Sequence, residues 1–201
     1  MKRKPTEVRQ AEIVEAAMRI IVAKGARRFT AQLIADEVGM TAGGIFRHFS
    51  SMDEIVDAVL DRMEEVLFQG FPPSAEDPWD RLKEFFEHRV QVMVEHPDIS
   101  RILLSDHLAH LGDGKPASRV ERLKRRSRRF VTRCLQEAAA SGAMASDVSV
   151  NAATVMVLGA ILAVGHSTTR VADETETKQL TAEVWRALEK MRHVSGTNSQ
   201  R

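Results

Sequence analysis

Residues 29–49, FTAQLIADEVGMTAGGIFRHF, decide how this chain is interpreted. Thr30 and Thr41 each stand where a side-chain oxygen caps a helix, and Gly39 suits a helix end that needs positive φ. The stretch therefore predicts two short helices joined by a tight turn, a helix-turn-helix that would set its second helix in the DNA major groove. Three apolar residues are expected to anchor this second helix from its far end and leave its first turn exposed: Ile45, Phe46 and Phe49.

The segment before this motif is basic. Residues 1–28 hold eight Lys or Arg against three Glu, although the whole chain of 201 residues has a net charge of only +1. Lys2, Arg3 and Lys4 form a basic arm, and residues 7–23 carry apolar side chains at the spacing of a helix with one buried face. Beside a helix-turn-helix, such a segment is expected to contact DNA phosphates.

The remainder of the chain predicts helices throughout. Helical periodicity and stop signals place them at 52–68, 79–95, 99–111, 117–141, 148–167 and 177–192, and no segment has the period-2 pattern of a strand. We therefore expect an all-α protein with a small N-terminal three-helix domain and a larger helical domain.

Cysteine usage and hydropathy bear on where the protein works. Cys134 is the single cysteine, which excludes an internal disulfide and favours a reducing compartment, so we expect a cytoplasmic protein. The most apolar run, residues 155–165, is shorter than a bilayer-spanning helix, and on this ground no membrane partner is expected.

The helix-turn-helix and its surroundings resemble the DNA-binding domain of the TetR family of transcriptional repressors over roughly residues 8–60. The resemblance is carried by Thr30, Ile34, Ala35, Gly39 and the segment Ile45-Phe46-Arg47-His48-Phe49. It implies a homodimer that binds double-stranded DNA at a near-palindromic operator and is released by a small, largely apolar effector. The expected division has three parts: a DNA-binding domain with its arm at 1–51, an effector-binding and dimerisation domain at 52–193, and, from its polar composition, a disordered tail at 194–201.

Under this resemblance, the expected DNA contacts fall on the arm, the two capping threonines and the recognition helix: Lys2, Arg3, Lys4, Thr30, Thr41, Ala42, Gly43, Gly44, Phe46, Arg47 and His48. The chain departs from the family at four positions. The family usually has Tyr at Phe46 and Lys at Met52, and Lys and Thr are frequent where this chain has Ala42 and Gly44. Because phosphate contacts position a protein on DNA, we expect the arm and first helix to replace the lost ones. The glycine pair has a second explanation, the close approach of two backbones.

Two helices, at about 117–141 and 148–167, are expected to form the homodimer interface. Residues 148–167 are apolar nearly all round, so this helix must be covered on several sides, either inside the core or between two chains. The family normally builds its dimer from its last long antiparallel helix pair. The eight Lys or Arg between 119 and 133 are interpreted as the wet face of an amphipathic helix, with a surface for an anionic partner as the alternative.

Candidate effector-binding residues are apolar side chains with a few polar groups that would orient a ligand: Phe85, Phe86, Met93, Leu103, Leu104, His107, Phe130, His166 and Arg170. No cofactor, no resident metal and no enzymatic activity are expected, since the sequence has no phosphate-binding loop, nucleophile elbow or HExxH motif. Two other functions stay open. One is an architectural DNA-binding protein without an effector, and the other is a metal-dependent hydrolase that uses Asp106, His107 and His110.

Overall fold

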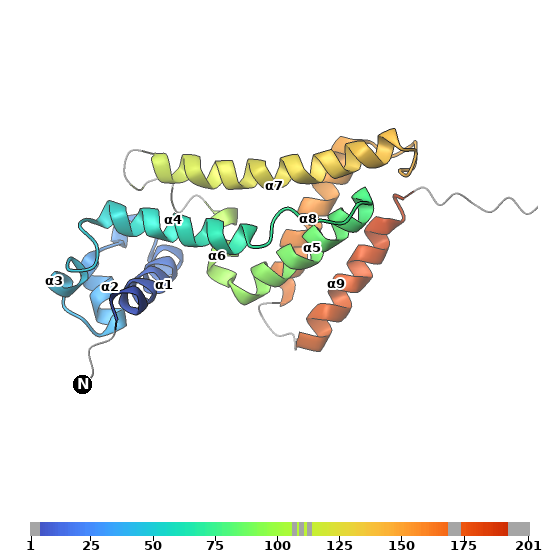
Figure 1. The fold of residues 1–201 in the computed structure, drawn as a ribbon. Coiled ribbons are helices and arrows are strands. Elements are labelled where there is room, and N and C mark those ends of the chain that lie inside the picture. Colours follow the sequence, from blue (N-terminus) through green and yellow to red (C-terminus); the bar gives the residue numbers. More distant parts are fainter. Residues whose placement is uncertain (1–4, 106–107, 109–110, 112–113, 169–173, 193–201) are drawn as a thin grey trace, which may run out of the picture. The chain divides into compact units, whose positions relative to one another are not determined.

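The structure, a computed structural model, describes residues 5–105, 108, 111, 114–168 and 174–192. Apart from one short 3-10 turn (Ala26–Arg28), its regular elements in these residues are all α-helices: α1 (Thr6–Lys24), α2 (Ala31–Val38), α3 (Ala42–Ile45), α4 (Met52–Phe68), α5 (Pro78–Glu95), α6 (Pro97–Leu104), α7 (Lys115–Ala140), α8 (Val150–Thr168) and α9 (Glu174–Glu189). Figure 1 shows them in chain order. The described part of the chain holds no β-strand, which confirms the all-α prediction.

The predicted helix limits agree with the structure to within three residues for every long helix except α6. The sequence places that helix at 99–111, whereas α6 ends at Leu104. For α4 both predicted ends are correct: Ser51 accepts a hydrogen bond from the backbone N–H of Glu54 (3.1 Å), and the helix then runs to Phe68. Side-chain capping thus marks a helix start that periodicity alone leaves open.

The chain forms two compact units, residues 1–69 with 98–124 and residues 70–97 with 125–201. Packing groups all of α4 with the helix-turn-helix, and α7 contributes residues to both units. These units are groups of residues that pack together, so the limits 1–51 and 52–193, which divide the chain by expected function, stay a prediction. The predicted tail at 194–201 lies outside the described residues.

In the first unit, α1 packs on α2 and α4, and α2 packs on α3 (Figure 1). Its core consists of side chains with no exposed surface, each contributing about 1.5–3 kcal/mol on burial: Ile13, Ile21, Ile34, Ile45, Ile55 and Leu60. These side chains come from α1, α2, α3 and α4, so the core itself sets the angle at which α3 is presented.

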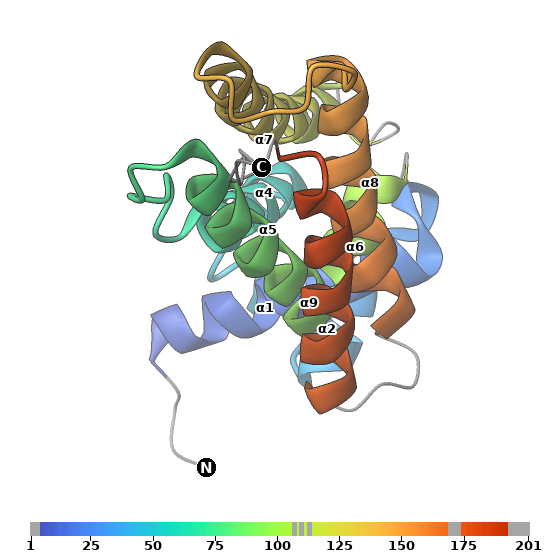
Figure 2. The same ribbon diagram turned by 90° about the vertical axis from the view of Figure 1, so that its right-hand side faces the viewer.

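In the second unit, α5 packs on α8 and α9, which lie side by side in Figure 2. The Trp185 ring on α9 lies 6.5 Å from that of Trp79 and 5.5 Å from that of Phe86, both on α5. The Trp79 indole N–H donates to the backbone oxygen of Ala143 at 3.1 Å. Aromatic contacts of this kind stabilise the fold beyond the burial of the rings and hold α9 against α5.

Helix α8 has two apolar faces. One is buried against its own unit and includes Ala153, Val157 and Ile161. The other exposes Val155 (57%) and Met156 (52%).

The prediction that the apolar run is too short to span a membrane is wrong. The window Val150–Ser167 has a mean hydropathy of 1.6 over 18 residues and, by length and composition, could cross a bilayer. One third of that window is buried inside the structure.

Candidate nucleic-acid interface

The turn between α2 and α3 is built as the sequence predicts. Thr30 accepts a hydrogen bond from the backbone N–H of Leu33 at 3.3 Å, and Thr41 accepts one from Gly44 at 3.0 Å. Gly39 ends α2 with φ 67° and ψ 43°, the left-handed conformation that costs glycine no steric penalty. Both caps and the turn are therefore confirmed.

The recognition helix is short. Only Ala42–Ile45 is α-helical, and the following backbone N–H groups of Arg47 and His48 reach back three residues to Gly44 and Ile45, at 3.3 and 2.9 Å. The chain thus continues as tight turns until Phe49. The side-chain amide of Gln10 donates to the backbone oxygen of His48 at 3.0 Å, which ties the end of this segment to α1.

The predicted apolar anchor is correct for two of its three residues. Ile45 is fully buried and Phe49 is 5% exposed, but Phe46 is 46% exposed. The expectation that Phe46 anchors the helix is wrong: Ile45 and Phe49 share one face, with the backbone N–H of Phe49 donating to the Ile45 oxygen at 3.2 Å, and Phe46 directly follows Ile45, so its side chain points about 100° away from that face. Phe46 instead joins Thr41, Gly43 and Arg47 on the exposed side of the motif, while Ala42, Gly44 and His48 are half-buried.

The two glycines of α3 have different surroundings. A Cβ atom at Gly43 would meet no described atom within 4 Å. A Cβ atom at Gly44 would lie 3.2 Å from Thr41 Oγ1 and 3.3 Å from Met40 Cε, both side-chain atoms of the turn itself. The explanation of close backbone approach finds no support in these surroundings. Gly44 makes room for the capping threonine, whereas Gly43 leaves the outer surface of α3 without a side chain.

The basic residues of α1 are less available to DNA than their number indicates. Arg9 pairs with Glu12 at 2.8 Å, and the Arg19 guanidinium pairs with Glu37 on α2 at 2.5 Å. The arm residues Lys2, Arg3 and Lys4 lie outside the described residues. Among the described residues expected to contact DNA, Arg47 is the one Lys or Arg, and it is exposed.

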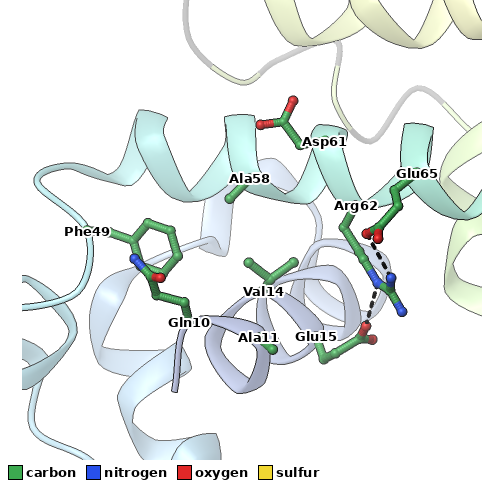
Figure 3. A pocket seen from close by; sticks show the side chains of 9 residues that line it. All are labelled: Gln10, Ala11, Val14, Glu15, Phe49, Ala58, Asp61, Arg62 and Glu65. Carbon is green, nitrogen blue, oxygen red and sulfur yellow. Dashed lines mark hydrogen bonds and ion pairs between the residues drawn. The ribbon is translucent and has the colours of Figure 1, made fainter. Parts of the chain in front are cut away.

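A groove of about 750 Å³ lies between α1 and α4 in the first unit (Figure 3). Val14 and Ala58 face each other across it, with Phe49 at one end. At the other end the Arg62 guanidinium lies between Glu15 (3.5 Å) and Glu65 (2.9 Å). Its carboxylates disfavour contact with phosphate, and it contains none of the residues expected to bind DNA or effector.

The candidate effector-binding residues that the structure describes fall in both units of the chain. Phe85, Phe86 and Met93 are buried on α5, but only Phe85 meets Phe130, at 5.0 Å between ring centroids; Phe86 instead faces Trp185. Leu103 and Leu104 belong to α6 of the first unit, where Leu104 is 54% exposed, and His166 is exposed on α8 of the second unit.

Several candidates fall on parts of the chain that the structure does not describe. His107 and Arg170 are outside the described residues, as are Asp106 and His110 of the hydrolase alternative. Within the described residues, no group of three or more His, Cys, Asp or Glu side chains could hold a metal ion. Sequence reasoning missed Phe71, Arg89 and Arg126, which lie at the Phe85–Phe130 contact.

Comparison with known proteins agrees with this architecture. Residues 13–59 match the family model described as bacterial regulatory proteins of the tetR family, and residues 79–193, more than half of the chain, match the tetracyclin repressor-like C-terminal domain. The transcriptional repressor KstR2 of Mycolicibacterium smegmatis is 26% identical over 146 residues, 71% of either chain.

Two solved structures share the fold. The ketosteroid transcriptional regulator KstR2 of Mycobacterium tuberculosis has a TM-score of 0.76 at 20% identity, over 93% of this chain and 96% of that one. AibR, solved in complex with isovaleryl coenzyme A and operator DNA, has a TM-score of 0.69 at 18% identity, over 89% and 97%. The two matching family models together span both the helix-turn-helix and the C-terminal helices, so the chain belongs to the TetR family of transcriptional regulators.

Proposed function

We propose that this protein is a cytoplasmic, ligand-responsive transcriptional repressor that binds a near-palindromic operator as a homodimer. The observation that carries the proposal is the Thr41-capped start of α3, which presents Gly43, Phe46 and Arg47 at the surface of a TetR-type DNA-binding domain. The relative named KstR2 is a transcriptional repressor, which supports this sign of regulation.

The DNA contacts we propose come from the two capping threonines, from the segment that begins with α3, and from the basic arm. Thr30, Thr41 and Arg47 donate to phosphates or base edges, and the Ala42 methyl can meet a thymine methyl. Gly43 and Gly44 bring the backbone close to DNA, Phe46 supplies ring surface, and His48 lies at the far end of the segment. Lys2, Arg3 and Lys4 add phosphate contacts from the arm.

Removing residues 1–5 should lower operator affinity and flatten its dependence on salt. Each lost phosphate contact reduces the slope of log K against log[salt] by about 0.9, so loss of three cations would reduce it by up to about 3. A fluorescence-anisotropy titration from low to physiological salt measures both quantities. Unchanged affinity and slope would contradict a role for the arm.

The homodimer interface we propose centres on the exposed face of α8, with α7 beside it. Val155 and Met156 are more than half exposed, and the small residues Ala152, Gly159 and Ala163 on the same helix are also exposed. A contiguous apolar face of this kind marks a protein contact, and small residues let a second helix approach. The hydrogen bond between Thr132 and Thr154, at 3.2 Å, joins α7 to α8 behind this face.

Met156→Arg should convert the dimer to monomers. In a two-fold interface the substitution places two new charges in apolar surroundings, and such a change costs several kcal/mol, so the dimer should weaken at least ~100-fold. Light scattering across a dilution series measures the mass. Gln91→Arg adds the same charge on the exposed side of α5 and should leave the mass unchanged; equal behaviour of the two variants would exclude α8 from the interface.

For the ligand response, we propose that α7 carries the signal. Its Arg119 guanidinium pairs with Asp61 at 2.6 Å and Asp57 at 3.3 Å, both on α4, and α4 follows directly on the recognition segment. Burial lowers the pKa of Arg119, but the hydrogen bonds and charges of Asp61 and Asp57 together hold that pKa above its ordinary value. Movement of α7 by a small, largely apolar effector would thus reach α4 through this contact.

A reporter gene placed behind a selected operator tests the proposed function. Expression of the protein should reduce transcription, and the Arg47→Ala variant should relieve that reduction. Increased transcription would identify an activator instead. The architectural alternative predicts no dependence of transcription on the operator sequence.

A further inference from the structure

Three phenylalanine rings of the second unit form one cluster. The centroid of Phe130 on α7 lies 4.9 Å from that of Phe71 and 5.0 Å from that of Phe85, and Phe71 and Phe85 are 6.2 Å apart. Phe85 is 2% exposed, while Phe71 and Phe130 are half-buried. The cluster therefore runs from the surface into the interior, so that a ligand can reach its outer rings from solvent.

Two arginines lie on these rings. The guanidinium carbon of Arg89, one turn after Phe85 in α5, is 5.0 Å from the Phe85 centroid, and that of Arg126 is 5.1 Å from the Phe71 centroid. Arg89 is only 5% exposed, whereas Arg126 is exposed. Arginine is seldom buried to this extent in an apolar setting, so its position among aromatic rings calls for a chemical reason. We call these five residues the aromatic–arginine cluster: Phe71, Phe85, Arg89, Arg126 and Phe130.

The charges in the aromatic–arginine cluster oppose one another. Burial, and after it the positive charge of Arg126, lowers the pKa of Arg89 to about 10. Arg89 thus stays a cation at neutral pH, and its charge is destabilised by a second cation nearby. A guanidinium has five N–H donors in a fixed fork, the geometry that carboxylate and phosphate oxygens match.

We propose that the aromatic–arginine cluster is the effector site and that the effector is an organic anion. Its carboxylate or phosphate group is held by the guanidinium groups of Arg89 and Arg126, which match such oxyanions in bidentate geometry, and its apolar body packs on the two outer rings, Phe71 and Phe130. This inference rests on the proposed ligand response and specifies the chemical class of the ligand. The anion relieves the repulsion between the two arginines, so binding stabilises the contact between α5 and α7.

The test compares probes of equal chain length on the full-length protein. Decanoate, decyl phosphate and the neutral decanol are titrated by calorimetry, and hexanoate is included for a shorter apolar body. We expect decanoate or decyl phosphate to bind about 10- to 100-fold more tightly than decanol, and the preferred anion to distinguish a carboxylate from a phosphate ligand. Equal affinity for anion and alcohol, or no saturable binding by any probe up to the limit of its solubility, would overturn the proposal.

Variants assign the binding to the arginines. Arg126→Met, at an exposed position that does not threaten folding, should lower anion affinity about tenfold and leave decanol unchanged; Arg89→Met should lower it further, and Arg89→Lys should restore part of it. Arg128→Met, at an exposed position on the same helix, is the matched control and should bind like the parent protein. Loss of anion affinity in Arg128→Met equal to that in Arg126→Met would overturn the assignment.

Release of DNA is measured separately, with the same probes added to the operator complex. Binding of the anion without release would contradict the proposed ligand response and leave the anion site standing. Release by the neutral alcohol, undiminished in Arg126→Met, would overturn the anion site and leave the ligand response standing.

Discussion

Replacing Gly44 with valine should lower operator affinity about 100-fold and destabilise the DNA-binding domain. A Cβ atom at this position already lies 3.2 Å from Thr41 Oγ1 and 3.3 Å from Met40 Cε, and valine adds two further methyl groups. Overpacking of this kind costs about 1–3 kcal/mol, and loss of the Thr41 cap costs about 1 kcal/mol more. Both costs act on the turn that orients α3. Urea denaturation should therefore show a lower free energy of unfolding, and DNA titration of the same variant should show a weaker operator affinity.

Gly43→Ala is the control for this change. A Cβ atom at Gly43 meets no described atom within 4 Å, and alanine favours a helix by up to about 1 kcal/mol over glycine. The fold should therefore keep its stability or gain some, and any loss of DNA affinity would report crowding at the DNA itself. A Gly44→Val protein that unfolds like the parent and binds DNA within twofold of it would refute this account of the turn.

Gly165→Ala should destabilise the second unit by about 2–3 kcal/mol, although alanine is the better helix former. A Cβ atom at Gly165 would lie 2.4 Å from Met93 Cβ and 3.7 Å from Met93 Cα. Rotation of the Met93 side chain moves neither atom, so α8 must shift away from α5. Because these two helices form the main contact of the second unit, the cost of overpacking should exceed the helix-propensity gain of about 1 kcal/mol.

Gly159→Ala, six residues earlier in α8, should not destabilise the second unit as Gly165→Ala does. Gly159 is exposed, and a Cβ atom there meets no described atom of its own chain within 4 Å, so Gly159→Ala should leave the fold of the chain unchanged or stabilise it by up to about 1 kcal/mol. Because Gly159 lies on the proposed dimer face, light scattering is used to measure any effect on association separately. Thermal denaturation of the two variants, at a protein concentration held fixed, measures the difference. Equal Tm values would contradict the close packing at Gly165.

Local backbone signals were the most reliable part of the sequence interpretation. Thr30, Thr41 and Ser51 cap helices as predicted, because a capping oxygen and its N–H partner lie within three residues of each other and need no tertiary information. Phe46 was misplaced because it was grouped with Ile45 and Phe49 by its apolar character, although a residue directly after Ile45 points about 100° away from the face that Ile45 and Phe49 share.

Side chains that meet across helices were predicted less well. Phe85 and Phe86 are both apolar residues that the sequence assigns to one site. Neighbouring residues on a helix point about 100° apart, so only Phe85 of the two reaches Phe130. Arg89 was missed because arginine is normally assigned to the wet face, and Arg126 was placed there as part of the basic run of α7. Phe71 stands in a proline-containing loop where no periodic pattern reveals its partners.

The central claim, that the exposed turn of α3 makes this protein a sequence-specific dimeric regulator, is tested most directly by selecting random DNA duplexes on the purified protein. The selected sequences are then measured against non-specific DNA at physiological salt. The account predicts an inverted repeat, with half-sites about one helical turn or a multiple of it apart and a preference of ~10³ or more over non-specific DNA. Loss of all preference at physiological salt would contradict it and would show that a recognition turn bearing Ala42, Gly43 and Gly44 binds DNA without reading its sequence.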